Sequence, residues 1–392
     1  MSIYRIAEAA IDDRADALRE LGRFVWENPE LGFEEIKAHE YITAYLESEG
    51  FQVSRNYLLP TAFRAEFGGS GPCVAFLCEY DALPGIGHAC GHNLIAESSV
   101  AAAIGAKAAL EARESSHNGR IVVLGTPAEE NGSGKQLLID KGAFKDLDVA
   151  MMAHPVPTSS NLRFQSIALA RLRVVYNGTA SHAGQSPWEG VNALDAAVGA
   201  YVNVSMLRQQ MKTNCRVHGV IKRGGLSSNV IPDETEMEYR VRAPTTEELA
   251  YLKDRVEGCF LAAAEATGCS VSVDVPTPMV KHLVPNEHLV RVFQKHGEAL
   301  GMDFFDADPA NAKLLGASTD AGNASHVVPL IHPGFALKTT ARNHTAAFTE
   351  VAGTEAAHQE ALITAKALCF TLLDVLENDE LLRDVKNEFQ AA

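Results

Sequence analysis

The sequence predicts an α/β protein. A main domain with a mainly parallel sheet flanked by helices carries an inserted, smaller α+β domain with an antiparallel sheet. Three observations predict this. The 392 residues exceed one ordinary domain and fit two. Unbroken apolar runs alternate with helical patterns in the first half, whereas the middle of the chain alternates apolar with polar residues. The hydrophobic fraction of 46% allows a sizeable core.

The first half supplies the parallel sheet. Amphipathic patterns predict helices over residues 6–26 and 35–49, and an Ala-rich stretch predicts another over 94–111. Three short apolar runs predict strands buried on both faces, because they show no polar alternation. These runs are residues 73–78, 121–124 and 149–152. Strands that alternate with helices indicate parallel pairing.

The inserted domain begins where the pattern changes, at about residue 169. Apolar–polar alternation predicts half-exposed antiparallel strands, which are residues 172–176, 236–242 and 270–275. Helical stretches at 190–208 and 246–267 lie between them. The main domain is therefore expected at 1–168 and 284–392, ending in a long helix over 355–377, and the inserted domain at 169–283.

Composition excludes several classes of partner. The formal net charge of −16 argues against nucleic acid and against an anionic membrane surface. No apolar run is long enough to span a bilayer, and the first residues lack the pattern of a signal peptide, so a cytoplasmic location is expected. Seven cysteines, an odd number mostly in apolar segments, indicate reduced thiols.

Chemically matched side chains follow the three predicted strands. Cys90 and His92 come after the first, Glu129 and Glu130 after the second, and His154 after the third. Ligands of open α/β sheets bind at the carboxyl ends of strands, so these residues are expected around one crevice.

These residue types predict a metal site. Thiolate, imidazole and carboxylate are the usual ligands of Zn²⁺ and similar ions, with manganese or cobalt as further options. Asp81 is a candidate to orient a ligand. The adjacent Glu129 and Glu130 suggest a division of labour, in which one carboxylate binds metal and the other acts as general base on a metal-activated water.

Each residue also has a plainer interpretation. Taken singly, His92 and His154 would be ordinary loop histidines, and Cys90 would be a small buried residue. The Glu129-Glu130 pair would be the solvent-exposed first turn of a helix. Asp81 before Leu83-Pro84 is ordinary turn chemistry. The metal site becomes the better explanation only when these residues are taken together. Several chemically matched groups that follow successive buried strands are not expected by chance.

The motifs together resemble a known family. They are Glu79-Tyr80-Asp81-Ala82-Leu83-Pro84, His88-Ala89-Cys90-Gly91-His92, Glu129-Glu130, His154-Pro155, His182-Ala183-Gly184 and Asn229-Val230-Ile231-Pro232. In this order and spacing the chain resembles metallopeptidase family 20, the aminoacylase, carboxypeptidase G and auxin-conjugate hydrolase group. The Cys-Gly-His form points to its amidohydrolase branch. Residues 318–325 and 331–333 look closest to the aminoacylase-like dipeptidases and the aminobenzoyl-glutamate hydrolases.

The resemblance implies a dinuclear centre for two divalent ions, Zn or Mn with Co as an option. Cys90 would bridge the ions, and His92, Glu130, His154 and His344 would complete the ligand set. Glu129 would be the general base, and Asp81, as the candidate that orients a ligand, is counted among the expected catalytic residues. The sequence pattern around His344 does not by itself indicate a ligand. His332 is the other candidate for this late ligand position, but it looks like a structural residue at a strand end.

The resemblance also assigns roles outside the metal centre. The inserted domain would be a lid and dimerisation domain, so a homodimer is expected. His182 would reach the active site of the second protomer and stabilise the oxyanion, and Asn229 and Arg242 would hold the substrate carboxylate, which suits a guanidinium. Substrate contacts would also come from Gly322 and Asn323. Many members of the branch have Asp where this chain has Asn93, which puts an acidic role there in doubt.

The expected activity is hydrolysis of an amide or peptide bond in a small substrate that bears a free carboxylate, either a dipeptide or an N-acyl amino acid. An aminobenzoyl-glutamate-type conjugate is the alternative substrate. A protein that holds metal and binds small amides without turnover is the alternative from another class, and the intact Glu129 argues against it.

Overall fold

A computed structural model describes residues 2–112, 119–164, 166–307 and 317–391. It confirms the α/β class. The chain divides into two compact units. The first comprises the described residues of 1–165, 283–313 and 319–392, and the second those of 166–282 and 314–318.

The first unit is built on a six-stranded sheet whose order is β1-β2-β4-β3-β5-β11. β3 pairs in parallel with β4 and β5, and β5 with β11, whereas β1 and β2 add an antiparallel edge. The three predicted strands therefore form its centre. The strands are β1 (Gln52–Arg55), β2 (Phe63–Gly68), β3 (Cys73–Cys78), β4 (Arg120–Gly125), β5 (Val149–Met151) and β11 (Leu330–Ile331). A separate parallel pair joins β6 (His154–Val156) to β12 (Gly334–Ala336).

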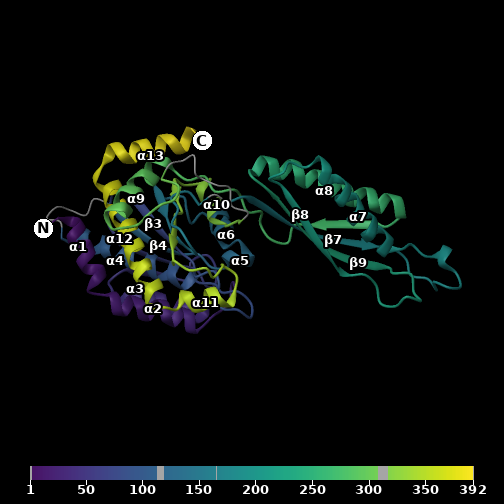
Figure 1. The fold of residues 1–392 in the computed structure, drawn as a ribbon, viewed down its shortest axis with the longest axis horizontal. Coiled ribbons are helices and arrows are strands. Elements are labelled where there is room, and N and C mark those ends of the chain that lie inside the picture. The colour runs from purple at the N-terminus through teal and green to yellow at the C-terminus, as the bar shows by residue number, and fades with distance from the viewer. Residues whose placement is uncertain (1, 113–118, 165, 308–316, 392) are drawn as a thin grey trace. The chain divides into compact units, whose positions relative to one another are not determined.

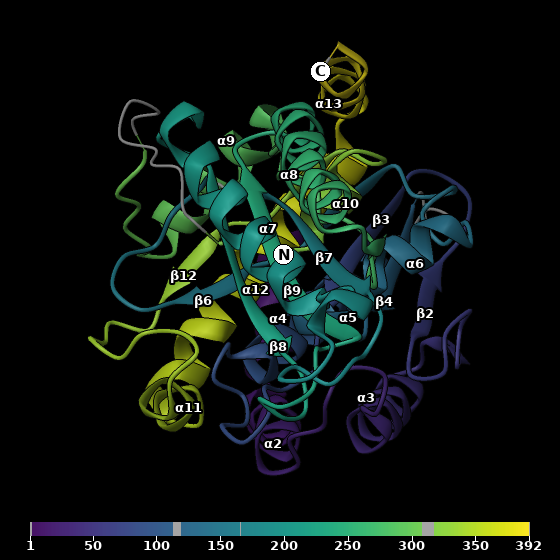
Figure 2. The same cartoon turned by 90° about the vertical axis from the view of Figure 1, so that its right-hand side faces the viewer.

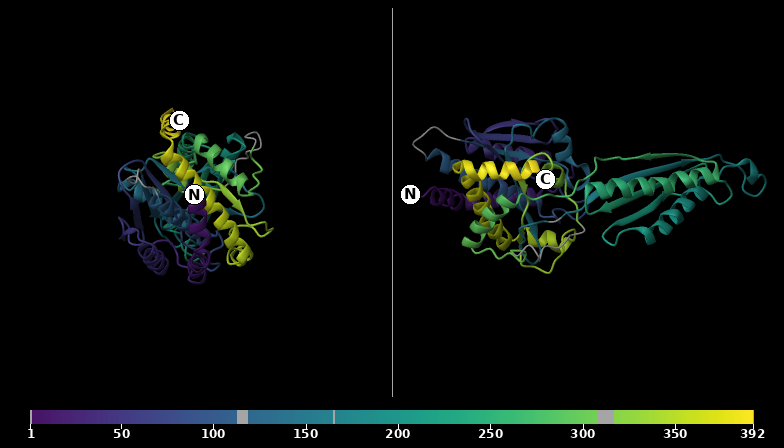
Figure 3. Two further views of the ribbon diagram at one scale, coloured as in Figure 1. Left: turned by 90° about the vertical axis from the view of Figure 1, so that its left-hand side faces the viewer. Right: turned by 90° about the horizontal axis from the view of Figure 1, so that it is seen from above.

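Both faces of the central strands are buried, as their unbroken apolar runs predict. Val74 and Phe76 belong to one core cluster, together with residues of α4 (His92–Glu111) and α12 (Glu355–Glu377). Ala75 and Leu77 point to the opposite face, into a cluster with α6 (Gly134–Asp140) and α10 (Ala321–Ser325). Helices thus cover both faces (Figure 1). α12 contacts α4, α9 and α1, and Figure 3 shows the yellow C-terminal helices in the same unit as the purple helix at the N-terminus.

The single helix predicted over residues 6–26 is wrong, because two helices occupy this segment. α1 (Ile3–Asp12) and α2 (Ala15–Glu27) are separated by a turn at residues 13–14. Each helix buries its own apolar stripe, and the break lets both stripes pack against α4. The remaining helices of this unit are α3 (Ile36–Ser48), α5 (Glu129–Gly132), α9 (Glu287–Ala299), α11 (Ala346–Ala352) and α13 (Asp379–Ala391).

The second unit is an antiparallel sheet of order β10-β7-β9-β8 that is covered on one face. Alternate residues of β7 and β9, such as Leu172 and Tyr239, pack under two helices, while the intervening residues include Arg173 and Glu236. The elements are β7 (Ala168–Asn177), β8 (Arg216–Arg223), β9 (Glu234–Ala243), β10 (Ser270–Asp274), α7 (Ala193–Leu207) and α8 (Thr246–Thr267), with short 3-10 turns at Pro187–Glu189 and Arg208–Gln210. The two helices contact each other (Figure 2).

Strand β8 had no prediction because its residues are mostly exposed and carry several charges. Its place is set by backbone pairing with β9 rather than by burial.

In the described part of the chain, no helix combines the length and apolar character needed to cross a bilayer.

Candidate metal centre

The side chains that follow the central strands converge in the first unit. Glu79 and Asp81 come directly after β3, Glu129 opens α5 shortly after β4, and His154 opens β6 after β5. Cys90 lies just before α4, which begins at His92. Parallel strands end at the same edge of the sheet, which brings these segments together.

Two groups of candidate ligands share Cys90. In one, Cys90, His92 and His154 offer ligand atoms that all lie within 4.8 Å of one another; in the other, Cys90, Glu130 and His344 do so. The Cys90 Sγ lies 3.3 Å from His154 Nε2, and His344 Nε2 lies 3.6 Å from Glu130 Oε1. The structure thus places all five predicted ligands around one centre, with the thiol common to both groups.

The donor set fits divalent cations. The buried His92 Nε2 makes no hydrogen bond to the described residues, although carboxylates surround it. Burial raises the pKa of the Cys90 thiol, and burial lowers the pKa of His154 to about 3, which keeps that imidazole neutral. A neutral imidazole is the ligand form of histidine, and a bound cation offsets the cost of a buried thiolate.

Two further carboxylates hold the ligand segments in place. Asp81 Oδ1 lies 3.0 Å from His92 Nδ1, and its Oδ2 accepts the Glu130 backbone N–H at 3.0 Å. Glu35 accepts the Ala128 N–H at 2.8 Å and the Thr61 hydroxyl at 2.7 Å. Burial raises the pKa of Glu35 to about 7. Ala128 itself has a positive φ of 58°, so Glu35 fastens a constrained turn immediately before Glu129.

Replacement of Asp81 by Asn is expected to weaken metal binding by about 10- to 100-fold, the effect typical of residues that orient ligands. An amide has only one acceptor oxygen, so either the His92 Nδ1–H or the Glu130 N–H loses its partner. Metal affinity measured by competition with a chromophoric chelator tests this, with the exposed Asp16→Asn on α2 as control. Unchanged affinity in Asp81→Asn would contradict the role.

Glu129 lies at the border between the ligands and a second acidic cluster. Its Oε2 is 4.0 Å from His92 Nε2. It also belongs to a group with Glu79 and Asp320, whose carboxylate oxygens lie within 4.8 Å of one another. Burial, followed by the charges of Glu79 and Glu130, raises the pKa of Glu129. Carboxyl groups whose pKa is raised in this way are common among the residues that transfer protons in active sites.

The predicted residues of the second unit form a polar group of their own. His182 is exposed, and its Nδ1 accepts the backbone N–H groups of Gly184 at 3.2 Å and Gln185 at 3.1 Å. The proton of the neutral ring therefore sits on Nε2, which can donate. Asn229 Nδ2 lies 3.4 Å from His182 Nε2, and an Nε2–H could donate to Asn229 only through the amide oxygen. Arg242 donates to Ser318 Oγ at 3.1 Å, and burial lowers the pKa of its guanidinium.

Other residues considered from the sequence have internal partners. Gly322 and Asn323 lie in α10, and Asn323 donates to Gln136 at 2.6 Å. Asn93 donates to the Ala352 carbonyl at 2.9 Å. His332 is buried and stacks on His154, with ring centroids 5.8 Å apart. The substrate-binding roles of Gly322 and Asn323 stay predictions.

Sequence reasoning did not find Glu35 or Lys135, both of which are buried beside the site. Neither follows a predicted strand directly, and a single acid or lysine in a helical pattern is typical of a surface position.

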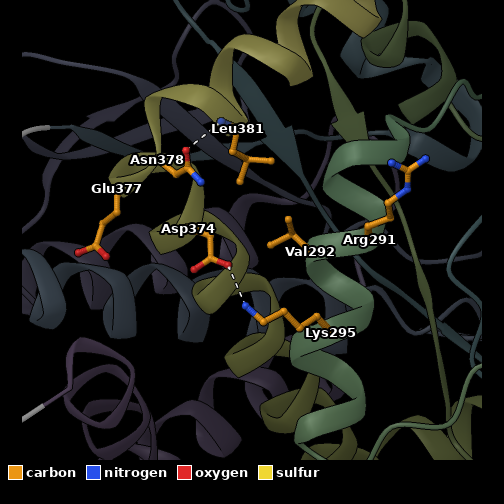
Figure 4. Close-up of a pocket in the computed structure, with 7 residues that line it drawn as sticks. All are labelled: Arg291, Val292, Lys295, Asp374, Glu377, Asn378 and Leu381. Atoms are coloured by element: carbon orange, nitrogen blue, oxygen red, sulfur yellow. Dashed lines mark hydrogen bonds and ion pairs between the residues drawn. The ribbon is translucent and has the colours of Figure 1, made fainter.

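A separate pocket of about 650 Å³ lies between α9 and the α12–α13 junction (Figure 4), where Lys295 pairs with Asp374 at 4.0 Å. None of the site residues predicted from the sequence lines this pocket.

A thiol, imidazoles and carboxylates gathered at the carboxyl edge of a mainly parallel sheet are a donor set that suits divalent metal ions. The chain belongs to peptidase family M20: residues 75–357 match the family described as Peptidase family M20/M25/M40. This confirms the family resemblance and shows that the protein is a metal-dependent peptidase.

Relatives span nearly the whole chain. The Xaa-Arg dipeptidase of Mus musculus is 49% identical over 402 residues, covering 99% of this chain and 92% of that protein. The Homo sapiens Xaa-Arg dipeptidase is 46% identical, covering 97% and 90%. One of the p-aminobenzoyl-glutamate hydrolase subunits of Escherichia coli (strain K12) is 28% identical, covering 99% and 95%.

Solved structures share the fold. The YxeP protein of Bacillus subtilis, a dinuclear metal-binding peptidase of the M20 family, matches with a TM-score of 0.68 and 21% identity, covering 93% of this chain and 99% of that one. An aminobenzoyl-glutamate utilization protein from Klebsiella pneumoniae matches with a TM-score of 0.66 and 18% identity, covering 90% and 96%. In this chain, two overlapping groups of ligand atoms that share Cys90 could each hold a metal ion.

Proposed function

We propose that this protein is a dipeptidase that hydrolyses dipeptides with a C-terminal arginine, using Glu129 as general base at a dinuclear metal centre. The observation that carries the proposal is the pair of ligand groups sharing Cys90, with Glu129 beside them. The 49% identity to an Xaa-Arg dipeptidase supports the substrate class. The net charge of −16 is also consistent with it, because acidic surfaces attract cationic substrates.

The residues that would hold the ions are Cys90, shared between them, with His92, His154, Glu130 and His344. When bound, the ions, for which zinc and manganese are the candidates, supply Lewis-acid polarisation and lower the pKa of water. The Glu129 carboxylate accepts a proton from the attacking water and passes it to the departing amide nitrogen. Asp81 keeps His92 and the Glu130 backbone oriented during these steps.

The second unit would supply substrate contacts. His182 Nε2–H is a candidate donor to the oxyanion that forms at the scissile carbonyl. Arg242 and Asn229 would bind the substrate's free carboxylate, the guanidinium by paired hydrogen bonds. In this proposal the unit is a lid that also pairs two chains, so that His182 acts in the active site of the second protomer and the working form is a cytoplasmic homodimer.

A substrate panel tests the proposal. Metal-reconstituted protein is expected to give its highest kcat/KM on dipeptides ending in Arg, to act less well on N-acetyl amino acids, and to lose activity when a chelator removes the metal. p-Aminobenzoyl-glutamate is included because a 28% identical relative is named for its hydrolysis. A higher kcat/KM on that conjugate would favour the alternative substrate class, and no hydrolysis of any amide would reject the enzymatic role.

A further inference from the structure

A fully buried lysine lies beside the proposed general base. Lys135, the second residue of α6, has no exposed surface. Its Nζ donates to Glu79 and, at 2.7 Å, to Asp320 Oδ1, and its backbone N–H donates to Asp320 Oδ2 at 2.9 Å. Replacing a buried ion pair with apolar side chains of similar volume often leaves the stability of a protein unchanged or increases it. The stability of the fold therefore does not by itself account for the ion pairs of Lys135.

The carboxylates around this lysine include Glu129. Carboxylate oxygens of Glu79, Glu129 and Asp320 lie within 4.8 Å of one another, a spacing at which such a group could hold a metal ion. They come from three segments, after β3, at the start of α5 and before α10. Like charges this close repel one another unless a cation lies among them. The Lys135 ammonium bonds two of the three acids and is the cation that the fold supplies.

The backbone fixes Lys135 relative to the segment that carries Glu129. A Cβ on the preceding residue, Gly134, would lie 1.8 Å from the Pro127 carbonyl oxygen. Only glycine therefore lets α6 begin against residues 127–130. Although burial opposes the charge, Asp320 and Glu79 raise the pKa of Lys135, so the ammonium stays protonated.

We propose that Lys135 is a positioning residue whose ammonium takes the place of a divalent cation in the Glu79–Glu129–Asp320 cluster and so holds the Glu129 carboxylate beside the metal centre. This inference rests on the proposed role of Glu129. It implies that the metal ions bind only on the Cys90 side, and that the acidic cluster gains affinity for metal when the lysine is neutralised.

The test uses Lys135→Met, the double variant Lys135→Met/Glu79→Gln, and Lys366→Met as matched control. Lys366 is another lysine between two acids, 2.7 Å from Asp12 and 3.5 Å from Glu8, on α12. Each full-length protein is equilibrated with Zn²⁺ alone, desalted and assayed for zinc per chain by mass spectrometry. The parameters kcat and KM are then measured on an Xaa-Arg dipeptide, and folding is checked by circular dichroism.

Lys135→Met is expected to bind one more zinc ion per chain than the unmodified protein and to lose about 10²-fold in kcat, with KM little changed, because a displaced catalytic group costs about that much. The double variant, which also lacks one acid, is expected to return to the original zinc content and to remain slow. The control Lys366→Met is expected to have the same zinc content, kcat and KM as the unmodified protein.

Unchanged zinc content together with unchanged kcat in Lys135→Met would overturn the inference. If that single variant does not fold, a double variant with unimpaired kcat would overturn it. Failure of the proposed function is distinct, because it appears in the unmodified chain as absent dipeptide hydrolysis while the zinc count of Lys135→Met still reports on the lysine.

Discussion

Glu129→Gln is expected to lower kcat by about 10²- to 10⁴-fold while leaving metal content unchanged, because general acid–base catalysis contributes on that order. Glutamine has nearly the same shape, yet it cannot take a proton from water or return it to the leaving nitrogen. The five candidate ligands remain, since Glu130 and not Glu129 shares a group with Cys90 and His344.

Steady-state kinetics on an Xaa-Arg dipeptide, paired with metal analysis, measures this effect. Glu111→Gln is the control, because that side chain is exposed at the end of α4 and pairs only with Lys107 among the described residues. A Glu129→Gln protein that keeps its metal and its kcat would show that another group transfers the proton.

Cys90→Ser is expected to weaken metal binding by more than about 100-fold, which exceeds the loss typical of a residue that only orients a ligand. The thiol is common to both ligand groups, so its replacement affects both ion positions. A serine hydroxyl stays neutral at pH 7 and is a harder, weaker ligand for zinc than a thiolate. Activity is expected to fall in step with metal content.

Metal titration of the stripped protein measures this second effect, and Cys259→Ser on α8 is the matched control, because Cys259 is a partly exposed free cysteine of the other unit. Excess metal should restore part of the activity of Cys90→Ser. Full metal occupancy of Cys90→Ser at the concentrations that saturate the unmodified protein would remove Cys90 from the ligand set.

The central strands and the long helices were predictable because their signals are local. The helix predicted over 246–267 and the one over 355–377 have the bounds that the structure gives to α8 and α12. Their periodicity and the caps at Thr245 and Thr354 lie within or next to the segments themselves. The break between α1 and α2 was not predictable in this way, because it depends on how two stripes meet α4.

The ligand candidates next to the strands were predictable for a related reason. A parallel sheet places the residues that follow successive strands at one edge, so Cys90, His92, Glu129, Glu130 and His154 could be grouped without coordinates. His344 could not be grouped from pattern, since it precedes the short α11 far along the chain. Its backbone N–H donates to the Ala89 carbonyl at 2.8 Å, a contact between segments distant in sequence.

The α/β class, the strands that end at the site and the kinds of candidate ligand that follow them could be predicted from the chain alone, because strand periodicity and ligand chemistry are properties of short segments. The folded structure was needed to show which acids surround Glu129, that Asp81 bridges His92 and the Glu130 backbone, and that Lys135 is buried between Glu79 and Asp320. These contacts join residues far apart along the chain, and no local pattern records which distant segment will supply the partner of a buried charge.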